Sequence, residues 1–474
     1  MKKHMRKKEE LYLKIALIFA LAILLVLMFM MFKIGRNDNR LNKTLSQTKN
    51  IENVNVAESK TFDDSENDEN DDIKGEKNDS DEHTYQKTED SKEKNSDIEN
   101  EEENKENQEK PKTEENKNAK NTSDYQNKAN YNNELFSEYY ARAEEIMKGM
   151  TLDEKVGQMF LARYPGTSVA LNETINFNPG GYILFAKDFS GKTKTSIASE
   201  LSNLQSNSKI NMFLAVDEEG GTVTRVSSYT NFRNTRFKSP QNLLNEGGIQ
   251  AVLDDSEEKS NLLKSLGLNM NLAPVVDVPT NSTSFMYDRS FGTDATKTAG
   301  YIKQLITKMN QDNMISSMKH FPGYGDNVDT HTGIAIDKRA YISFENTDFL
   351  PFEAGIQANG PTIMVNHNII NCLDASKPAS LSENVHKILR ENLGFSGLII
   401  TDDLAMAAVK SYVANGEAAV QAVIAGNDLI ISSNFKTQKQ DVINAVKNGR
   451  IPEETINTAV RRILACKLKY GIIE

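Results

Sequence analysis

Residues 133–474 are predicted to form an α/β domain, a (β/α)8 barrel of the TIM type, on three observations. Short apolar runs recur eight times, helical patterns separate most of them, and each run ends in polar residues. Continuous apolar runs of this length suit parallel strands that are buried on both faces. Strand and helix alternating eight times is the pattern of such a barrel. A doubly wound open sheet is the alternative fold.

The chain begins with a basic tail, residues 1–14, which is followed by an apolar segment, IALIFALAILLVLMFMMF, at residues 15–32. The segment carries no charge and is just long enough to cross a membrane once as a helix. Basic residues before it favour a cytoplasmic N-terminus and place everything after it outside the cell. We therefore expect a single-pass signal anchor in the cell membrane with an extracellular domain. A cleaved signal peptide and a buried core helix are the alternatives.

Residues 33–132 form an acidic, low-complexity segment, of which TFDDSENDENDDIKGEKNDSDEHT is typical. Such a composition cannot bury enough apolar surface to offset the entropy of the chain, so we expect a disordered linker. A tail that binds cations or a partner is the alternative. The formal net charge of −11 comes largely from this linker and says little about any site in the barrel.

The predicted strands of the barrel are apolar on both faces, and the patterns between them, such as residues 195–207 and 296–310, have helical periodicity. In chain order the strands are 158–163, 181–187, 212–218, 270–277, 314–320, 362–367, 398–403 and 428–433. Their polar ends are Arg163, Lys187, Asp217, Asp277, Lys319 with His320, Asn366 with His367, Asp402 with Asp403, and Ser432 with Ser433. In a barrel these ends converge on one rim, where enzymes of this fold build their active sites.

The stretch KHFPGYGDNVDTHTG, residues 319–333, combines titratable side chains with glycines that allow the backbone to bend. Lys319 and His320 end a predicted strand, and the remainder is a loop able to reach over the rim. Within it, Asp329 and His331 are two positions apart, which can bring a carboxylate onto an imidazole. A carboxylate fixes the tautomer of the imidazole and makes it a proton donor and acceptor near neutral pH. A surface Asp–His pair without a function is the alternative.

Several classes of site are not indicated by the sequence. It contains no zinc motif, P-loop or GxGxxG pattern, so we expect no metal, no cofactor and no nucleic-acid partner. Its two cysteines, Cys372 and Cys466, are far apart and lack the spacing of metal ligands. We expect both to be buried free thiols rather than a disulfide.

From about Leu135 to Glu474 the chain resembles the family 3 glycoside hydrolases, in particular their single-barrel β-N-acetylglucosaminidase branch. The motifs occur in the family's order and cover nearly all of the predicted barrel. They are KVGQMF, PGGYILFAKDF, AVDEEGGTVTR, NLAPVVDV, YDRSFGTD, KHFPGYGDNVDTHTG, ASLSENVHKILRENLGFSGLIITDDLAM and AVRRILACKLKYGII. The resemblance identifies the barrel as a family 3 catalytic domain.

The resemblance also implies roles for individual residues. Asp402 of IITDD matches the catalytic nucleophile, and His331 with Asp329 matches an acid/base dyad. The residues that match sugar-binding positions are Asp217, Arg225, Arg289, Lys319 and His320. From the residues alone Asp403 remains an alternative to Asp402, since successive strand residues face opposite ways and only one can point into the barrel mouth. Either arginine could instead brace a loop carboxylate such as Asp288.

The sequence departs from the family in two respects. The family usually has histidine where this chain has Tyr324, which leaves the resting position of the loop open. Some members also carry a C-terminal domain that has no counterpart here. Neither departure affects the matches of Asp329, His331 and Asp402.

The activity that the resemblance implies is that of a retaining exo-β-N-acetylglucosaminidase. It would hydrolyse terminal β-linked GlcNAc through a covalent glycosyl-aspartate. The expected substrates are GlcNAc-containing glycans, above all muropeptides and other peptidoglycan fragments, since an anchor and a linker could extend into a cell wall. The alternatives are a β-glucosidase or β-xylosidase of the same fold, an N-acetylglucosaminide phosphorylase, and a catalytically silent barrel that binds the cell wall.

Overall fold

The computed structural model describes residues 134–331, 333–413 and 417–474. The predicted basic tail at 1–14, the signal anchor at 15–32 and the linker at 33–132 lie outside these residues. Within the described part of the chain, every helix is too short or too polar to cross a bilayer.

Eight parallel strands form one sheet in which the last strand of the chain pairs with the first. The strands are β1 (Phe160–Arg163), β2 (Gly181–Leu184), β3 (Phe213–Val216), β4 (Met270–Asn271), β5 (Ile315–Phe321), β7 (Thr362–Val365), β9 (Leu398–Thr401) and β10 (Ile430–Ser432). The order around the sheet is β10-β1-β2-β3-β4-β5-β7-β9. A parallel bridge between Ile400 and Leu429 joins the two ends of this order and nearly closes the barrel. The predicted TIM-type barrel is therefore confirmed, and the open doubly wound sheet is wrong.

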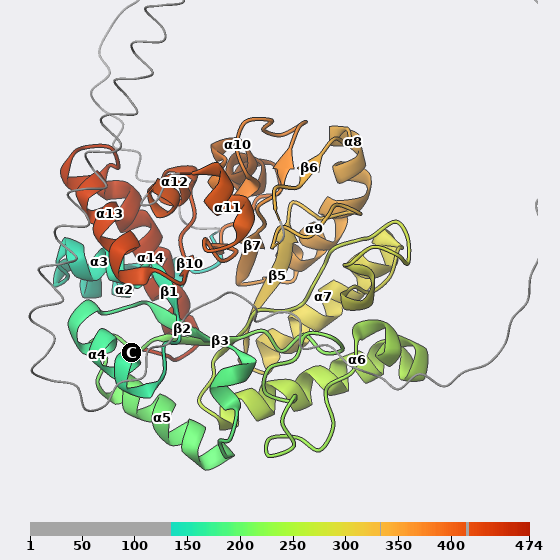
Figure 1. Ribbon diagram of the computed structural model, residues 1–474, viewed down its shortest axis with the longest axis horizontal. Helices are drawn as coiled ribbons and strands as arrows, with labels where there is room; N and C mark the ends of the chain where they lie inside the picture. The colour runs from blue at the N-terminus through green and yellow to red at the C-terminus, as the bar shows by residue number, and fades with distance from the viewer. Residues whose placement is uncertain (1–133, 332, 414–416) are drawn as a thin grey trace, which may run out of the picture. The chain divides into compact units, whose positions relative to one another are not determined.

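Helices surround the strands (Figure 1). They are α2 (Tyr140–Lys148), α3 (Leu152–Gln158), α4 (Thr167–Phe177), α5 (Lys194–Ser206), α6 (Pro240–Ser265), α7 (Ala295–Gln311), α8 (Tyr341–Ser343), α9 (Phe349–Gln357), α10 (Glu383–Lys387), α11 (Ala407–Tyr412), α12 (Glu417–Ala425), α13 (Phe435–Lys447) and α14 (Glu453–Lys469). The final helices, red in Figure 1, lie beside the first strand of the barrel. The chain thus returns to its starting point after one circuit.

Helix α7 illustrates how the sequence specifies this layer. The Asp294 side chain accepts a hydrogen bond from the backbone N–H of Lys297 and caps the first turn. Four apolar residues spaced for one helical face are buried against the barrel: Ile302, Leu305, Ile306 and Met309. The helix ends at Gln311, and Asn313, with a positive φ of 53°, turns the chain into β5.

Seven of the eight strands are shorter than the apolar runs that predicted them, and β5 has the length of its run but lies one residue later in the chain. The largest difference is in the run at 270–277, where only Met270–Asn271 belongs to the sheet. Pro274 interrupts this strand because proline has no N–H to donate to the ladder. Backbone bonds to β5 nevertheless continue beyond it: the Pro274 carbonyl accepts from the Lys319 N–H at 3.2 Å, and the Val276 N–H donates to the Lys319 carbonyl at 2.7 Å. The loop after β4 is thereby held against the end of β5.

A small parallel pair, β6 (Ile336–Asp337) with β8 (Ile369–Ile370), lies outside the barrel sheet. It fixes the end of the loop that follows β5. The cysteines are free, as predicted; Cys466 is buried, but Cys372 is exposed, so the expectation that both would be buried was wrong for Cys372.

Candidate active site

The polar ends of the strands meet at the rim formed by the carboxyl ends of β3, β5 and β9. Asp217 directly follows β3, Lys319 and His320 lie near the end of β5, and Asp402 directly follows β9. Parallel strands all present their carboxyl ends at the same side of a barrel, so the residues converge although long stretches of chain separate them.

Lys319 is the centre of a buried charge network. Its Nζ lies 2.6 Å from Asp217 Oδ1 and 2.7 Å from Glu219 Oε1. Burial by itself would lower the pKa of Lys319, but the two carboxylates outweigh it and raise the pKa above its ordinary value. The ammonium group is therefore charged and fixed in position at any pH near neutrality.

Glu219 joins this network to Arg289 through a bidentate pair. Arg289 Nε and Nη2 donate to Glu219 Oε2 and Oε1 at 2.9 and 2.8 Å. Burial opposes ionisation of Glu219, yet Arg289 and Lys319 lower the pKa of this carboxyl below its ordinary range. Arg289 braces Glu219, not Asp288, and its Nη2 also lies 3.5 Å from His320 Nε2.

His320 is oriented by Asp277. The Nδ1 of His320 is 2.7 Å from Asp277 Oδ2, and the backbone N–H of His320 donates to the same oxygen at 3.1 Å. Because a carboxylate accepts from Nδ1–H, the Nε2 atom is left to face the site. Asp277 thus has a defined task, whereas its place in the sequence suggested only that it belonged to the rim.

Arg225 differs from the other predicted sugar-binding residues. Its guanidinium carbon lies 5.9 Å from the centroid of the Phe185 ring, and Arg163 lies 4.6 Å from the same centroid. No described residue accepts a hydrogen bond from its buried Nε. The backbone N–H of Arg225 donates to Glu218 Oε2 at 2.8 Å, which fixes the loop that carries it.

The two aspartates after β9 have different surroundings. Asp402 Oδ1 accepts from the Asp403 N–H at 2.8 Å, and the Asp402 N–H donates to the Val365 carbonyl at 3.0 Å. Asp403 instead accepts from Ser433 Oγ and from the Ala405 N–H, both at 2.9 Å, and its carbonyl lies 3.0 Å from His367 Nε2.

The carboxyl groups of Asp402 and Asp403 also differ in the direction of their pKa shifts. Burial would raise the pKa of Asp402, but the imidazoles of His367, His320 and His331 hold it below its ordinary value. For Asp403, burial prevails and raises the pKa. Asp402 is therefore the aspartate that is kept ionised beside imidazoles.

Asp329 and His331 form a close pair in the loop after β5. His331 Nδ1 lies 2.6 Å from Asp329 Oδ1, and the His331 backbone N–H donates to that oxygen at 3.0 Å. Partial burial raises the pKa of Asp329, but its bonds to His331 outweigh this and lower it. The side chains are 32% and 41% exposed, so this pair is open to solvent where the network around Lys319 is not.

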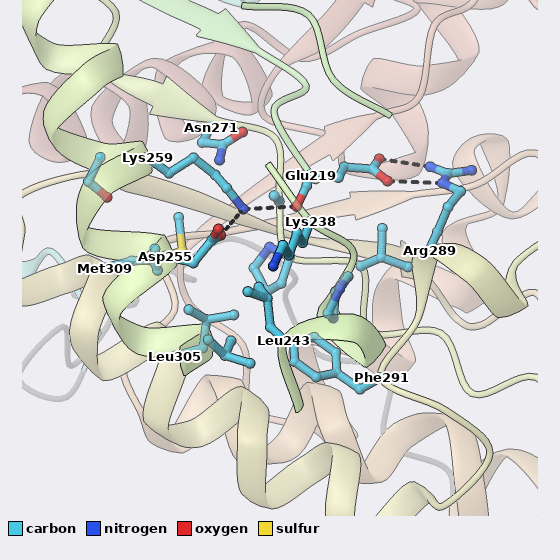
Figure 2. Close-up of a pocket in the computed structure, with 17 residues that line it drawn as sticks. Glu219, Lys238, Leu243, Asp255, Lys259, Asn271, Arg289, Phe291, Leu305 and Met309 are labelled. Carbon is cyan, nitrogen blue, oxygen red and sulfur yellow. Dashed lines mark hydrogen bonds and ion pairs between the residues drawn. The ribbon is translucent and has the colours of Figure 1, made fainter. Parts of the chain in front are cut away.

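A cavity of about 510 Å³, counted with its open mouth, lies behind the charge network, between α6, α7 and the strands. Figure 2 shows Glu219 between Arg289 on one side and Lys259 on the other. The lining of the cavity includes Glu219 and Arg289 but none of Asp402, Asp329 and His331. The cavity is therefore adjacent to the sugar-binding candidates and separate from the candidate catalytic groups.

The structure adds residues that the sequence analysis did not select. Glu219 is two positions after Asp217, so an extended backbone places both on one side, a signal that was present in DEEGG. Asp277 and His367 were predicted to lie at the rim, but their roles gave no comparable signal, since their partners are distant in the chain. Among the described residues, no cluster of three or more His, Cys, Asp or Glu side chains is arranged to hold a metal ion.

Residues 151–466 match the sequence profile of the glycosyl hydrolase family 3 N-terminal domain. A beta-hexosaminidase A from Pseudoalteromonas piscicida is 29% identical over 333 residues, which are 63% of this chain and 55% of that protein. A beta-hexosaminidase from Nitrosomonas eutropha is 28% identical over 277 residues, 56% of this chain and 77% of that protein. The chain thus spans only about half the length of the first of these relatives.

The structure is also similar to a solved glycoside hydrolase family 3 beta-N-acetylglucosaminidase from Paenibacillus sp. str. FPU-7. The TM-score is 0.65 at 29% sequence identity, and the match covers 68% of this chain and 63% of that one.

Proposed function

Because this chain belongs to glycosyl hydrolase family 3, as the match over two thirds of its length establishes, we propose that it is a retaining exo-β-N-acetylglucosaminidase. It removes a terminal β-linked GlcNAc from a glycan. The observation that carries the proposal is the placement of Asp402 after β9 beside a loop that holds His331: Asp329 binds His331 Nδ1 at 2.6 Å, and the backbone N–H of Ala408, in the helix after Asp402, donates to the Thr330 carbonyl of that loop. The names of the similar proteins support the substrate class.

In the first step, Asp402 attacks the anomeric carbon while the bond from that carbon to the leaving oxygen breaks. The electron pair of the broken bond remains on the leaving oxygen, which takes a proton from Nε2 of His331. The products are a glycosyl-aspartate and a free alcohol. Asp329 stabilises the imidazolium before transfer and keeps Nε2 pointed at the reacting oxygen.

In the second step, the neutral His331 takes a proton from water while the water oxygen bonds to the anomeric carbon. The Asp402 carboxylate leaves with the electron pair of the ester bond, and His331 is again protonated. Each group returns to its starting state, so one cycle consumes one glycosidic bond and one water molecule.

The network around Lys319 holds the sugar during both steps. The Lys319 ammonium donates two of its hydrogens to Asp217 and Glu219. Within the described part of the chain, its third hydrogen remains available to a sugar hydroxyl. His320 Nε2 and Arg289 provide further polar contacts, and Arg225 supplies a guanidinium for an N-acetyl carbonyl or a hydroxyl. Charged donors fixed in a buried network orient the ring without further loss of entropy on binding.

We further propose that the enzyme acts on peptidoglycan fragments outside the cell. This rests on the sequence, in which an apolar segment at 15–32 and an acidic linker at 33–132 precede the barrel. Such a tether would let the barrel work within a cell wall while it stays bound to the membrane.

The test is hydrolysis by the purified full-length chain of 4-nitrophenyl N-acetyl-β-glucosaminide and 4-nitrophenyl β-glucoside between about pH 5 and about pH 8. We expect at least a tenfold preference for the N-acetylglucosaminide, since a hydrogen bond to a charged group contributes about 1.5–3 kcal/mol, which corresponds to about tenfold or more. No release from either substrate would refute the proposal. Preference for the glucoside would make the chain a β-glucosidase.

Phosphorolysis is a second candidate, favoured by one observation. The proposed base is an imidazole, which is neutral when it activates the acceptor and does not repel phosphate as a carboxylate would. Adding phosphate to the same assay and looking for the sugar 1-phosphate distinguishes the two reactions. Hydrolysis is supported if the free sugar is the sole product.

A further inference from the structure

The loop that carries Asp329 and His331 is fastened by two buried hydroxyl groups. Tyr324 Oη lies 2.5 Å from Thr330 Oγ1, and the two side chains are 2% and 0% exposed. Thr330 stands between Asp329 and His331 in the chain. A contact at Thr330 therefore sets the position of both members of the pair.

Tyr324 is itself fixed to the sugar-binding side of the site. Its backbone N–H donates to Asp277 Oδ1 at 2.8 Å, the same carboxylate that orients His320. Its ring makes an edge contact with the His320 ring at a centroid distance of 5.2 Å and an angle of 87°. The Tyr324 ring also packs edge-on against the Phe285 ring, with a centroid distance of 5.1 Å and an angle of 86° between the ring planes.

Thr330 makes a second contact, toward the segment that follows Asp402. Its carbonyl accepts from the backbone N–H of Ala408, in α11, at 3.4 Å. Thr330 is therefore bonded on one side to the residue that packs on His320 and on the other to the helix that follows Asp402. It is the point at which the loop meets both parts of the site.

We propose that Tyr324 and Thr330 form a clasp that positions His331 for proton transfer, with neither residue touching the reacting atoms. The proposal rests on the proposed function of Asp402 and His331 and adds the residues that hold the acid/base in place. Buried hydroxyls need partners, and here each satisfies the other, so removing either leaves the other unpaired. The loop then loses its fixed position near Asp402.

The clasp predicts a specific kinetic signature. A misplaced proton donor slows the departure of a poor leaving group much more than that of nitrophenolate, which leaves without full protonation. A substitution that merely weakens the fold or shifts Asp402 slows both substrates alike. Comparing two leaving groups therefore separates a positioning role from a structural one.

The first experiment measures kcat and KM of the full-length chain on a GlcNAc disaccharide and on the nitrophenyl glycoside. For Tyr324→Phe and Thr330→Val we expect kcat on the disaccharide to fall about 10- to 100-fold, with about threefold or less on the nitrophenyl glycoside. Thr330→Ser keeps the hydroxyl and should restore most of the loss. The double variant should be little worse than either single one, because both remove the same bond.

Tyr164→Phe is the matched control. Tyr164 Oη donates to Thr167 Oγ1 at 3.1 Å, so this variant also breaks a tyrosine–threonine pair, a half-buried one at the start of α4. It should leave the ratio of the two rates unchanged. Equal losses on both substrates for Tyr324→Phe, or additive losses in the double variant, would overturn the clasp.

The second experiment does not depend on activity. Amide hydrogen exchange should be faster for peptides covering residues 325–331 in Tyr324→Phe and Thr330→Val than in the unaltered chain, by about tenfold or more. Peptides from β1 and α4 should not change. Unaltered exchange in 325–331 would overturn the clasp even if the enzyme is active. If the unaltered chain cleaves neither substrate, the proposed function fails while the exchange result still decides the clasp.

Discussion

The two ends of the barrel hold buried charge in different ways. At the carboxyl ends of the strands, Lys319 lies between two carboxylates and Glu219 binds both Lys319 and Arg289. At the amino ends, Lys467 of α14 is fully buried, and its Nζ donates to an uncharged partner, Gln158 Oε1, at 2.7 Å. The ammonium nitrogen also lies 5.0 Å from the centroid of the Phe213 ring.

Because of this difference, we expect the two ends of the barrel to affect different measurable properties. Buried ions that are paired and hydrogen-bonded keep their charge and can hold a ligand, at a cost in desolvation that the partners offset. A buried lysine without a carboxylate tends to give up its proton instead. In barrels of this kind the carboxyl end carries the chemistry and the amino end contributes stability. We expect substitutions at the carboxyl end to change rates and those at the amino end to change the free energy of unfolding.

The largest effect is expected for Asp402→Asn. It removes the group proposed to bond to the anomeric carbon, so turnover should fall by about 10⁴-fold or more on every substrate, whatever the leaving group. The matched control is its neighbour: Asp403→Asn should retain at least 100 times the activity of Asp402→Asn. Initial rates with the nitrophenyl glycoside measure both. Comparable losses in the two variants would remove Asp402 from the nucleophile's role.

A smaller and more selective effect is expected for His331→Ala. On a GlcNAc disaccharide, kcat should fall by about 10²- to 10³-fold, because the leaving oxygen is no longer protonated. On the nitrophenyl glycoside the loss should be less than about tenfold. Asp329→Asn should give the same pattern with smaller losses, since the imidazole remains but is less well held. Parallel kinetics on the two substrates is the measurement, and equal losses would contradict the donor role.

The positions of the strands were predictable because each apolar run is buried on both faces, which fixes its place in the sheet whatever its neighbours are. The location of Asp402 and Asp403 at the rim was predictable for a related reason, as both directly follow such a run, but the choice between them came from the family resemblance. The role of Asp277 was not predictable, because it depends on His320, which is 43 positions away and on another strand. The role of Thr330 was not predictable, because a threonine between Asp329 and His331 has no distinctive sequence pattern. Its partner Tyr324 was noted only as a departure from the family.

Glu219→Gln tests whether the paired network is needed for binding. With one carboxylate fewer, the charges of Lys319 and Arg289 are no longer balanced, and breaking a buried pair of this kind costs about 3–5 kcal/mol of stability. We expect kcat/KM to fall by about 10²-fold, mainly through a higher KM. Glu258→Gln, which breaks a half-exposed pair with Arg233, is the control and should change neither kcat/KM nor stability by much.

The same variant has a predicted pH dependence. Because the pKa of Glu219 is lowered in the folded chain, its contribution to stability is present above the unfolded pKa of about 4.3 and is lost as the pH falls below it. The difference in urea midpoint between the unaltered chain and Glu219→Gln should therefore shrink as the pH is lowered from about 6 toward about 3. A difference that stays constant over this range would mean that the charge of Glu219 does not stabilise the fold.

At the amino end, Lys467→Met should leave kcat and KM unchanged and increase stability near neutral pH. Burial lowers the pKa of Lys467 to about 7, while in the unfolded chain it is near 10.4. Between these values the unfolded state binds the proton and the folded state does not, so stability rises with pH across this interval. The penalty relative to an uncharged side chain is therefore greatest at pH 7 and below, and disappears near pH 10. Near pH 6.5 this penalty is about 4.5 kcal/mol, whereas losing the bond to Gln158 costs about 2 kcal/mol at every pH. We therefore expect a gain of about 2 kcal/mol near pH 6.5 that becomes a loss of about 1–2 kcal/mol by about pH 10.

Lys439→Met is the matched control, because Lys439 is also buried at this end but is paired with Asp153 at 2.7 Å and donates to the Phe177 carbonyl at 2.8 Å. This variant should be destabilised, since its partners lose a donor that nothing replaces. Urea unfolding of all three chains at about pH 6.5 and about pH 9.5 provides the measurement. A stability difference for Lys467→Met that is the same at both values would show that Lys467 stays protonated, and the contrast between paired charge at one end of the barrel and unpaired lysine at the other would not hold.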